Sequence, residues 1–302
     1  MQRYYLTLDI GGTYIKYASI NSEGNIGEKG KVETPKSLDE LFLLIDEIWA
    51  TYKDKVNGIA ISCPGRVDTN TGTVYKGGAL PYLDGTSFKK ILEDKYNMPC
   101  AVCNDGKAAA LAELWLGHLQ SIENGAAIVL GTGVGGGIIV NGRIIQGDHY
   151  QAGELSFLLR SPESTNTDNF IGFSGSAVNF IRKSSQLLEL DKLDDGIAVF
   201  EAINEGNHEE LIENFTIYCR EIVFIIHNLQ AILDISKVVI GGGVSAQPIL
   251  IKGIREQYNL LRRNSKLIDQ TFEAVEIEVC KFGSEANLLG ALYQLLVQLK
   301  IK

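Results

Sequence analysis

The sequence predicts a two-domain protein of the α/β class. The chain has 302 residues, which is more than one hydrophobic core usually supports. Strand-like apolar segments alternate with amphipathic helices in the first half, and each half begins with an apolar strand that runs into glycines, at 4–12 and 126–133. We therefore expect a small N-terminal domain of residues 1–117 plus 288–302 and a large C-terminal domain of residues 118–287.

The first half of the chain predicts a sheet covered by helices. A strand ends near Asp9, and a hairpin partner follows at residues 17–20. Ser37 and Glu40 form a capping box, which marks the start of a helix, and the apolar residues after them share one helical face. A strand, a turn, a strand and a helix follow, at 56–62, 64–65, 99–103 and 107–117. This alternation indicates β/α winding.

The second half begins in a similar way and is then richer in helix. Residues 126–130 and 137–140 predict a tight hairpin around a glycine-rich turn. The stretch 222–240 is apolar but interrupted by polar residues, so it predicts a buried helix followed by a strand rather than a bilayer span. Residues 161–169 predict an exposed loop. The last helix, from about Glu285, is expected to pack back on the first domain.

Composition and charge exclude several kinds of partner. Hydrophobic residues make up 45% of the chain, and no low-complexity tract indicates disorder. The formal net charge is -9 and the basic residues are scattered, so neither nucleic acid nor a membrane is expected as a partner. The N-terminus runs straight into a strand without the pattern of a secretion signal. A cytoplasmic protein is therefore expected.

The chain has five cysteines, an odd number that gives no disulfide framework. The only close pair is Cys100 and Cys103, inside a strand-like segment. Without a second pair or a nearby histidine, such a pair is more often buried apolar filler than a metal site. We therefore expect these two thiols in the core.

The segment DIGGTYIK, which begins at Asp9, places an acid at the end of a strand and two glycines in the turn after it. Glycine lets backbone N–H groups approach phosphate oxygens, while Thr13 adds a hydroxyl donor and Lys16 adds a charge. Asp9 is of the type that binds Mg²⁺ or its water ligands. A plain hairpin turn would explain the glycine pair, Gly11 and Gly12, equally well.

Two further glycine clusters follow. The segment GTGVGGG begins at Gly131 and has five glycines in seven residues. Glycine inside a strand costs about 0.5–1 kcal/mol, so the cluster favours close approach of a ligand to the backbone. Residues 241–243, after an apolar strand, repeat the pattern and are candidates for binding the adenosine or the α-phosphate of a nucleotide. A structural turn is the alternative there.

A pair of polar residues, Asn104 and Asp105, ends a strand and precedes a helix. Catalytic side chains emerge at strand ends in α/β sheets, and the dipole at a helix N-terminus favours a negative charge. Asp105 is therefore a candidate catalytic carboxylate. The alternative is that it only caps the helix.

These motifs occur in an order that resembles one family. DIGGTYIK, SCPG, NDGKAAALAE, GTGVGGG, AGE and VVIGGG, spread over residues 9–243, are similar to segments of the ROK family of sugar kinases and related repressors. The resemblance implies the actin-like ATPase (ribonuclease H-like) fold, with ATP and a sugar meeting in a ligand cleft between the two domains. It also implies Mg²⁺ with the nucleotide, and a homodimer.

The resemblance implies roles for particular residues. Asp105 would be the general base that accepts the proton of a sugar hydroxyl, and Asp9 would bind the metal ion. A second set would contact the sugar, and a third set the nucleotide. The sugar set is Gly65, Asn104, Asp105 and Glu154, and the nucleotide set is Gly11, Gly12, Thr13, Lys16, Thr132, Gly133, Gly242 and Gly243.

The sequence departs from the family pattern after the AGE motif. Many members continue with a Gly-His whose histidine binds a structural zinc, and then with a cysteine-rich loop. Here Phe157 occupies the histidine position and residues 158–174 contain no cysteine, so no structural zinc is expected. Phe170 aligns with the acid that closes that loop, so two aromatic rings replace polar partners of the sugar. His149 is either a contact to a second sugar unit or an exposed loop residue without a role.

With these departures, the sequence resembles the β-glucoside kinases. This resemblance implies ATP-dependent phosphorylation of glucose or a β-glucoside such as cellobiose, at O6. One alternative is a repressor, but ROK repressors carry a helix-turn-helix module of about 70 residues ahead of the kinase-like part, and Asp9 leaves no room for one. A sugar-binding or sensor protein without turnover is the other alternative. The glycine motifs and Asp105 argue against it.

Overall fold

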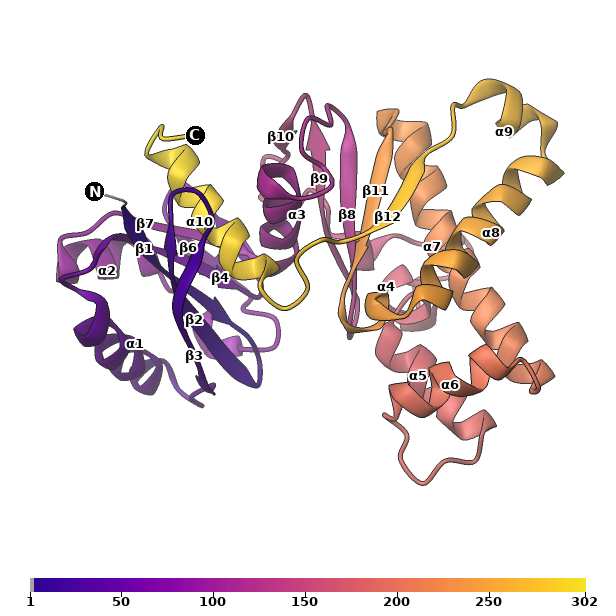
Figure 1. Ribbon diagram of the computed structural model, residues 1–302, viewed down its shortest axis with the longest axis horizontal. Helices are drawn as coiled ribbons and strands as arrows, with labels where there is room; N and C mark the ends of the chain where they lie inside the picture. Colours follow the sequence, from indigo (N-terminus) through magenta and orange to yellow (C-terminus); the bar gives the residue numbers. More distant parts are fainter. Residues whose placement is uncertain (1–2) are drawn as a thin grey trace. The chain divides into compact units, whose positions relative to one another are not determined.

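The computed structural model describes residues 3–302, which separate into two compact units. The first unit contains the chain up to Gln120, the short segment Gln146–Ala152 and the stretch Ser284–Lys302, and the second contains Ser121–Ile145 and Gly153–Gly283. Figure 1 shows the elements of each unit in the colours of the sequence. The sequence prediction assigned the short segment to the second domain, together with the chain on either side of it.

The first unit is built on a mixed sheet. Its strands are β1 (Tyr4–Ile10), β2 (Tyr14–Asn21), β3 (Ile26–Glu33), β4 (Val56–Cys63) and β7 (Cys100–Asn104). Their order across the sheet is β3-β2-β1-β4-β7, with antiparallel pairing from β3 to β1 and parallel pairing from β1 to β7. β1 and β4 are buried along almost their whole length, because helices cover both faces of the sheet.

One face of this sheet is covered by α1 (Leu38–Tyr52) and α2 (Phe88–Tyr96). α1 begins at Ser37, whose hydroxyl accepts a hydrogen bond from the N–H of Glu40 (3.3 Å), as the capping box predicts. Its apolar stripe joins β1 and β4 in one core. The remaining short elements on this side are β5 (Arg66–Asp68), β6 (Thr73–Tyr75) and a 3-10 turn at Pro81–Leu83.

The other face is covered by α10 (Ala286–Gln298), which contacts β1, β4 and β7. α10 also lies along α3 (Asp105–Leu116). Gly290 permits this close packing, because a Cβ there would lie only 1.8 Å from the carbonyl oxygen of Ala108. The last helix therefore completes the first unit, as the sequence predicted.

The second unit is built on a sheet of the same plan. Its strands are β8 (Gly125–Leu130), β9 (Val134–Val140), β10 (Arg143–Ile144), β11 (Lys237–Gly241) and β12 (Glu276–Val279). Their order is β10-β9-β8-β11-β12, again antiparallel from β10 to β8 and parallel from β8 to β12. The two sheets thus agree in the order and in the relative directions of their strands.

The second unit is richer in helix than the first. The long helix α7 packs on α5 and α8 and shares a core with β8 and β11, so the stretch 222–240 forms a helix end and a strand as predicted. The helices are α4 (Ile171–Ser174), α5 (Ala177–Leu187), α6 (Gly196–Glu205), α7 (Glu209–Leu233), α8 (Pro248–Asn264) and α9 (Lys266–Thr271). Nowhere in residues 3–302 does a helix combine the length and the apolar character that a membrane crossing requires.

Candidate functional site

The first glycine turn joins β1 to β2. Gly11 donates its N–H to the carbonyl oxygen of Tyr14 (3.1 Å), and the Thr34 hydroxyl donates to the carbonyl oxygen of Gly11 (2.6 Å). A Cβ on Gly11 would lie 2.9 Å from the Tyr14 oxygen, so the hairpin itself accounts for this glycine. Gly12 and Thr13 are exposed at the tip of the turn. Their backbone N–H groups and the Thr13 hydroxyl can bind an anion there.

Asp9 lies near the end of β1, on the face covered by α10. Only 8% of its surface is exposed, and the Asn287 amide donates a hydrogen bond to Oδ1 (3.0 Å). Burial raises the pKa of this carboxyl, and the Asn287 bond and the charge of Lys16 oppose that rise without cancelling it. Lys16 Nζ donates to the carbonyl oxygen of Ser284 (3.2 Å). A nearby cation would stabilise the ionised form of such a buried carboxyl.

Mg²⁺ fits this carboxyl by its chemistry. The ion prefers oxygen ligands and is usually bound by one or two carboxylates together with waters and substrate phosphates. Across residues 3–302, no three His, Cys, Asp or Glu side chains gather into a metal site made by the protein alone. Asp9 would therefore bind Mg²⁺ together with water and phosphate oxygens.

The junction of β7 and α3 carries the candidate base. Asn104, rather than Asp105, caps the helix, because its side-chain oxygen accepts a hydrogen bond from the Lys107 N–H (3.1 Å). Oδ1 of Asp105 accepts from the Gly106 N–H (2.8 Å) and from the Asn104 amide (3.0 Å). The same amide donates to the carbonyl oxygen of Gly65 (2.9 Å). Capping does not explain Asp105, and the structure brings Gly65, Asn104 and Asp105 into one hydrogen-bonded group.

Gly65 occupies a backbone conformation that favours glycine. Its φ is +93°, and a Cβ there would lie 2.8 Å from the carbonyl oxygen of Lys76. The turn can therefore bring its backbone against Asn104 only with glycine at this position.

Sequence reasoning missed Lys107, which is only 2% exposed. Its Nζ donates to Oε1 of Gln146 and to the carbonyl oxygen of Tyr150, at 2.9 Å each. The available signal was a lysine two residues after Asp105, at the start of the apolar run KAAALAELWL. A lysine is almost never fully buried unless it is paired. A buried Lys107 therefore implies partners from elsewhere in the chain, which the motif does not indicate.

Glu154 belongs to the second unit, ahead of a short 3-10 turn at Leu155–Phe157. Phe157 is 71% exposed, and its ring meets that of Phe170 edge to face at 6.2 Å. The two aromatic residues singled out in the sequence thus contact each other. The contact of Glu154 with the sugar stays a prediction.

The turn between β8 and β9 is tied to the loop that follows Glu154. The Gly131 N–H donates to the carbonyl oxygen of Gly133 (3.0 Å), and the Ser156 hydroxyl accepts from the N–H of Val134 (2.9 Å). A Cβ on Gly133 would lie 2.7 Å from Oγ of Ser156, whereas one on Gly131 would meet nothing within 4 Å. Packing therefore does not require glycine at position 131, although its carbonyl oxygen accepts a hydrogen bond from the Ala177 N–H (3.0 Å), and the exposed tip of the turn is Thr132.

Packing explains some of the glycines that the sequence assigned to ligand approach. A Cβ on Gly136 would lie 2.6 Å from the carbonyl oxygen of Ala127. One on Gly242 would lie 2.0 Å from the carbonyl oxygen of Leu130, and the φ of Gly242 is +96°. The structural turn that the sequence left open as an alternative accounts for Gly242. Gly243 has open space around it instead.

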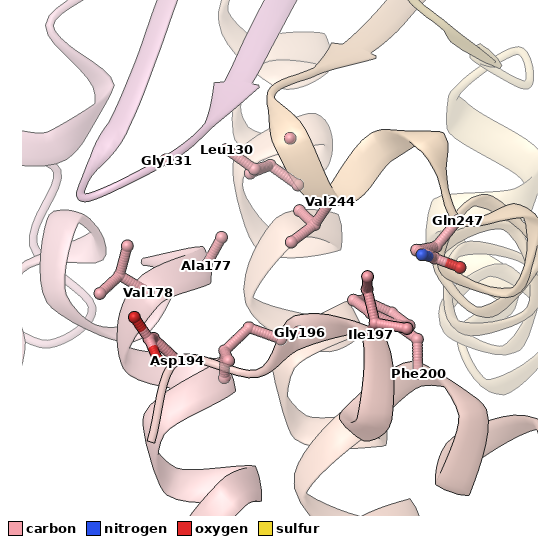
Figure 2. Close-up of a pocket in the computed structure, with 12 residues that line it drawn as sticks. Leu130, Gly131, Ala177, Val178, Asp194, Gly196, Ile197, Phe200, Val244 and Gln247 are labelled. Carbon is pink, nitrogen blue, oxygen red and sulfur yellow. The ribbon is translucent and has the colours of Figure 1, made fainter. Parts of the chain in front are cut away.

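The second unit contains a cavity of about 400 Å³ beside Gly131 and Gly243. Figure 2 shows apolar side chains around this space, with Asp194 and Gln247 as its polar side chains. The residues that line it are Leu130, Gly131, Ala177, Val178, Ile181, Asp194, Gly196, Ile197, Phe200, Gly243, Val244 and Gln247. Apolar walls with few polar groups suit a flat ring system. No motif marks the α6 residues in this wall, because the segment GIAVFEAI shows only the pattern of a helix.

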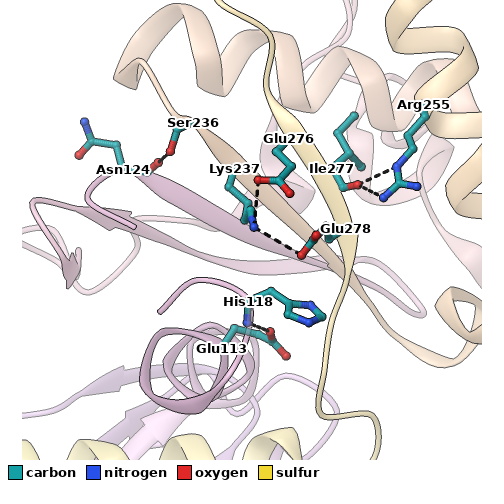
Figure 3. Close-up of polar contacts among 9 residues, drawn as sticks. All are labelled: Glu113, His118, Asn124, Ser236, Lys237, Arg255, Glu276, Ile277 and Glu278. Carbon is teal, nitrogen blue, oxygen red and sulfur yellow. Dashed lines mark hydrogen bonds and ion pairs between the residues drawn. The ribbon is translucent and has the colours of Figure 1, made fainter. Parts of the chain in front are cut away.

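A group of charged side chains at the edge of the second sheet is structural (Figure 3). Lys237 of β11 contacts Glu276 (3.0 Å) and Glu278 (3.5 Å) of β12. Burial disfavours the ammonium, but the two carboxylates outweigh it and raise the pKa of Lys237. Arg255 Nε of α8 donates to the carbonyl oxygen of Ile277 (2.8 Å). These contacts attach β12 to its neighbours.

Cys100 and Cys103 are buried in β7 and form no disulfide. Burial raises the pKa of both thiols. The expectation that this pair is buried apolar filler is therefore confirmed.

The fold and these sites together define a class: a mixed α/β protein of two units, each with an open glycine turn, and with a cavity for a small ligand in the second unit. The family follows from comparison with known proteins. The model of the ROK family matches residues 5–298, and the chain belongs to that family.

Known relatives are similar over nearly the whole chain. A β-glucoside kinase of Listeria monocytogenes is 28% identical over 294 residues, which cover 95% of this chain and 96% of the relative. A glucokinase of Halalkalibacterium halodurans is 31% identical over 320 residues, with coverage of 95% and 93%. The structure also matches that of a ROK family protein from Streptococcus pneumoniae in complex with sucrose, with a TM-score of 0.89, 29% identity and coverage of 99% and 100%.

Proposed function

We propose that this ROK protein is an ATP-dependent sugar kinase that phosphorylates glucose or a β-glucoside such as cellobiose, at O6. The observation that carries the proposal is the oriented carboxylate of Asp105. Asp105 starts α3, and its Oδ1 is fixed by the Gly106 N–H and the Asn104 amide. The names of the relatives, a β-glucoside kinase and a glucokinase, support a sugar as the acceptor.

Asp105 is the general base in this proposal. In phosphoryl transfer the protein mainly positions the reacting groups and neutralises charge, so the carboxylate needs only to orient the attacking hydroxyl and accept its proton. The N-terminus of α3 favours a negative charge at that point. Gly65, Asn104 and Glu154 bind the other hydroxyls of the sugar, because a hydroxyl left unpaired in a site costs affinity.

The nucleotide is assigned to the glycine turns and the cavity. The exposed tips of the turns after β1 and β8 support phosphate binding there. The apolar cavity beside Gly243 suits the adenine ring. Mg²⁺ at Asp9 supplies neutralisation of charge on the phosphate oxygens when it is bound. The residues proposed to contact ATP are Gly11, Gly12, Thr13, Lys16, Thr132, Gly133, Gly242 and Gly243.

The actin-like, ribonuclease H-like architecture is part of the proposal, with a domain of residues 1–117 plus 288–302 and a domain of residues 118–287. The matching strand order of the two sheets supports it. A homodimer in the cytoplasm, acting on a small sugar without nucleic acid or membrane, completes the assignment.

We also propose that the enzyme needs no structural zinc. Asn169 holds the loop after Phe157 through hydrogen bonds: its amide donates to the carbonyl oxygens of Ser161 (2.6 Å) and Ser164, and its Oδ1 accepts from the Ser161 N–H (3.1 Å). These hydrogen bonds support the proposal, because they are a source of order in the loop that needs no metal ion. The rings of Phe157 and Phe170 offer faces on which the apolar side of a pyranose can stack.

The Asp105→Asn variant tests this function. Asparagine keeps the size and the Oδ1 acceptor, so the fold and ATP binding should persist, while turnover should fall by at least ~10²-fold because the base is lost. The measurements are ATP consumption with glucose and with cellobiose, and ATP binding by calorimetry. Normal turnover would remove Asp105 from the mechanism. A wild-type protein that binds sugars but consumes no ATP with any of a panel of them would favour the non-catalytic alternative.

A further inference from the structure

Lys107 is the only buried lysine among residues 3–302, with 2% exposure. An ammonium removed from water is costly unless it is well hydrogen-bonded. Its Nζ donates to Oε1 of Gln146 and to the carbonyl oxygen of Tyr150, at 2.9 Å each. These two acceptors come from one short segment, Gln146–Ala152, so the ammonium ties that segment to α3.

The segment Gln146–Ala152 belongs to the first unit, although the chain on either side of it belongs to the second. It makes a compact turn, because the Tyr150 N–H donates to the carbonyl oxygen of Gly147 (3.2 Å) and the Ala152 N–H donates to that of Gln146 (3.1 Å). Tyr150 has φ +58°, a left-handed conformation that a non-glycine residue keeps only when its surroundings hold it there.

A second set of bonds holds Tyr150 from its other end. The Asn70 amide donates to the Tyr150 hydroxyl (2.9 Å). Burial acts to raise the pKa of Asp68, but a hydrogen bond with the Tyr150 hydroxyl and bonds within its own turn lower it. Lys107 of α3 thus binds the carbonyl oxygen of Tyr150, and Asn70 in the loop after β5 binds its hydroxyl. The segment is fixed at two points, and Lys107 provides one of them.

We propose that Lys107 is a positioning residue for the acceptor sugar. Its ammonium holds Gln146–Ala152 on the helix that begins with Asp105. The segment carries His149 and leads, two residues after Ala152, to Glu154, so its anchoring sets the path of the chain that supplies the sugar contacts. This inference rests on the proposed kinase function, because it concerns the acceptor side of that site.

The Lys107→Met variant removes the charge and keeps the length of the side chain. We expect the KM for the sugar to rise ~10-fold or more, as for the loss of hydrogen bonds from a charged group, while the KM for ATP stays unchanged. Hydrogen exchange of the amides in 146–152 should become faster, while that of α1 does not change. Lys107→Arg, which keeps the charge, should recover part of the sugar affinity.

The Gln146→Leu variant removes one acceptor and leaves Lys107 in place, so it tests the same contact even if Lys107→Met fails to fold. We expect a smaller rise of the KM for the sugar. The double variant should be no worse than Lys107→Met alone, because the contact between the two side chains can be lost only once. The matched control is Lys90→Met, which removes an exposed lysine of α2 that pairs with Asp94 (2.8 Å) and should change neither KM nor hydrogen exchange.

Two results would overturn the proposal: equal changes in the KM for sugar and for ATP, or unchanged hydrogen exchange at 146–152 in both Lys107→Met and Gln146→Leu. A separate measurement tests the proposed function itself. Normal turnover of Asp105→Asn would remove the base, while the exchange experiment would still report whether Lys107 holds the segment.

Discussion

The two units share a strand order but differ in the character of their interiors. Within residues 3–302, every charged side chain that is buried lies in the first unit, namely Asp9, Lys107 and Glu113. The buried polar side chains of the second unit are neutral, and its cavity is lined mainly by apolar groups. One sheet plan therefore supports two kinds of site, because the residues at the strand ends, rather than the order of the strands, decide the chemistry.

The glycine turns differ in the same way. The turn after β1 follows the buried carboxyl of Asp9, whereas the turn that begins at Gly131 borders an apolar cavity. In the proposed function, the cation and the proton belong to the first unit, and the nucleotide ring belongs to the second. Substitutions in one unit can therefore test each side of this division separately.

The largest effect is expected for Asp9→Asn. Loss of the carboxylate removes the proposed ligand of Mg²⁺ and its charge balance at the phosphates, so turnover should fall by ~10²-fold or more. The measurement is turnover across a Mg²⁺ titration with saturating sugar. A variant with normal turnover at normal Mg²⁺ would contradict the assignment of the cation to the first unit.

The same substitution should change stability with pH. Because burial raises the pKa of Asp9, its contribution to stability is complete below the usual carboxyl pKa and is lost as the pH rises through the raised value. Asp9→Asn has no charge to bury, so without ligands it should be more stable than the wild type at neutral pH and show no such gain at low pH. Thermal unfolding at the two pH values measures the difference, and a less stable variant at neutral pH would refute it.

Gly242→Ala should lower the stability of the fold. The added methyl group would lie 2.0 Å from the Leu130 carbonyl oxygen, at a φ of +96°, so the free energy of unfolding should fall by about 2–4 kcal/mol. Gly243→Ala is the matched control, since a Cβ there meets nothing within 4 Å, and its stability should change by about 0.5 kcal/mol at most. Denaturant unfolding of both variants decides whether these neighbours differ as described.

Ile197→Ser should weaken nucleotide binding. Ile197 lines the cavity but is 69% exposed, so the fold should tolerate the change. Loss of apolar contact with the ring should raise the KM for ATP by about 5–10-fold, with the KM for sugar unchanged. Leu267→Ser alters another exposed apolar residue of the second unit, one that does not line the cavity, and should change neither value. If Ile197→Ser raised only the KM for sugar, the cavity would bind the sugar rather than the nucleotide.

The smallest effect is expected from zinc removal. Because hydrogen bonds of Asn169 order the loop after Phe157, activity should survive strong zinc chelation when Mg²⁺ is supplied. Metal analysis of the purified protein should find no stoichiometric zinc. Activity that disappears on chelation and returns with zinc would show that this loop needs a metal ion after all.

Local signals made much of the fold predictable. The capping box at Ser37 starts α1, and the final helix begins at Ala286, next to the predicted Glu285. These predictions succeed because a cap and an apolar stripe depend on residues within one or two turns. Asp105 was singled out for the same reason, since the end of a strand and the start of a helix are visible in the sequence.

Long-range contacts made the rest unpredictable. Nothing near Lys107 in the sequence shows that its partners lie some forty residues away, at Gln146 and Tyr150. The cavity is assembled from β8, α5, α6 and the 3-10 turn Gly243–Ala246 ahead of α8, so no single motif marks it. The glycine clusters contain positions of two kinds, because a Cβ would collide with the backbone at Gly242 but would meet nothing within 4 Å at Gly131. Only the atoms around each glycine in the folded structure distinguish the two kinds.

The place of α10 has a consequence for synthesis on the ribosome. α10 packs on α3 through Gly290 and covers one face of the first sheet, yet it follows the whole of the second unit along the chain. The first sheet therefore lacks the cover of α10 until translation has passed residue 298. The second unit can form its core before then, so we expect the nascent chain to complete the later unit first, the reverse of the usual vectorial order.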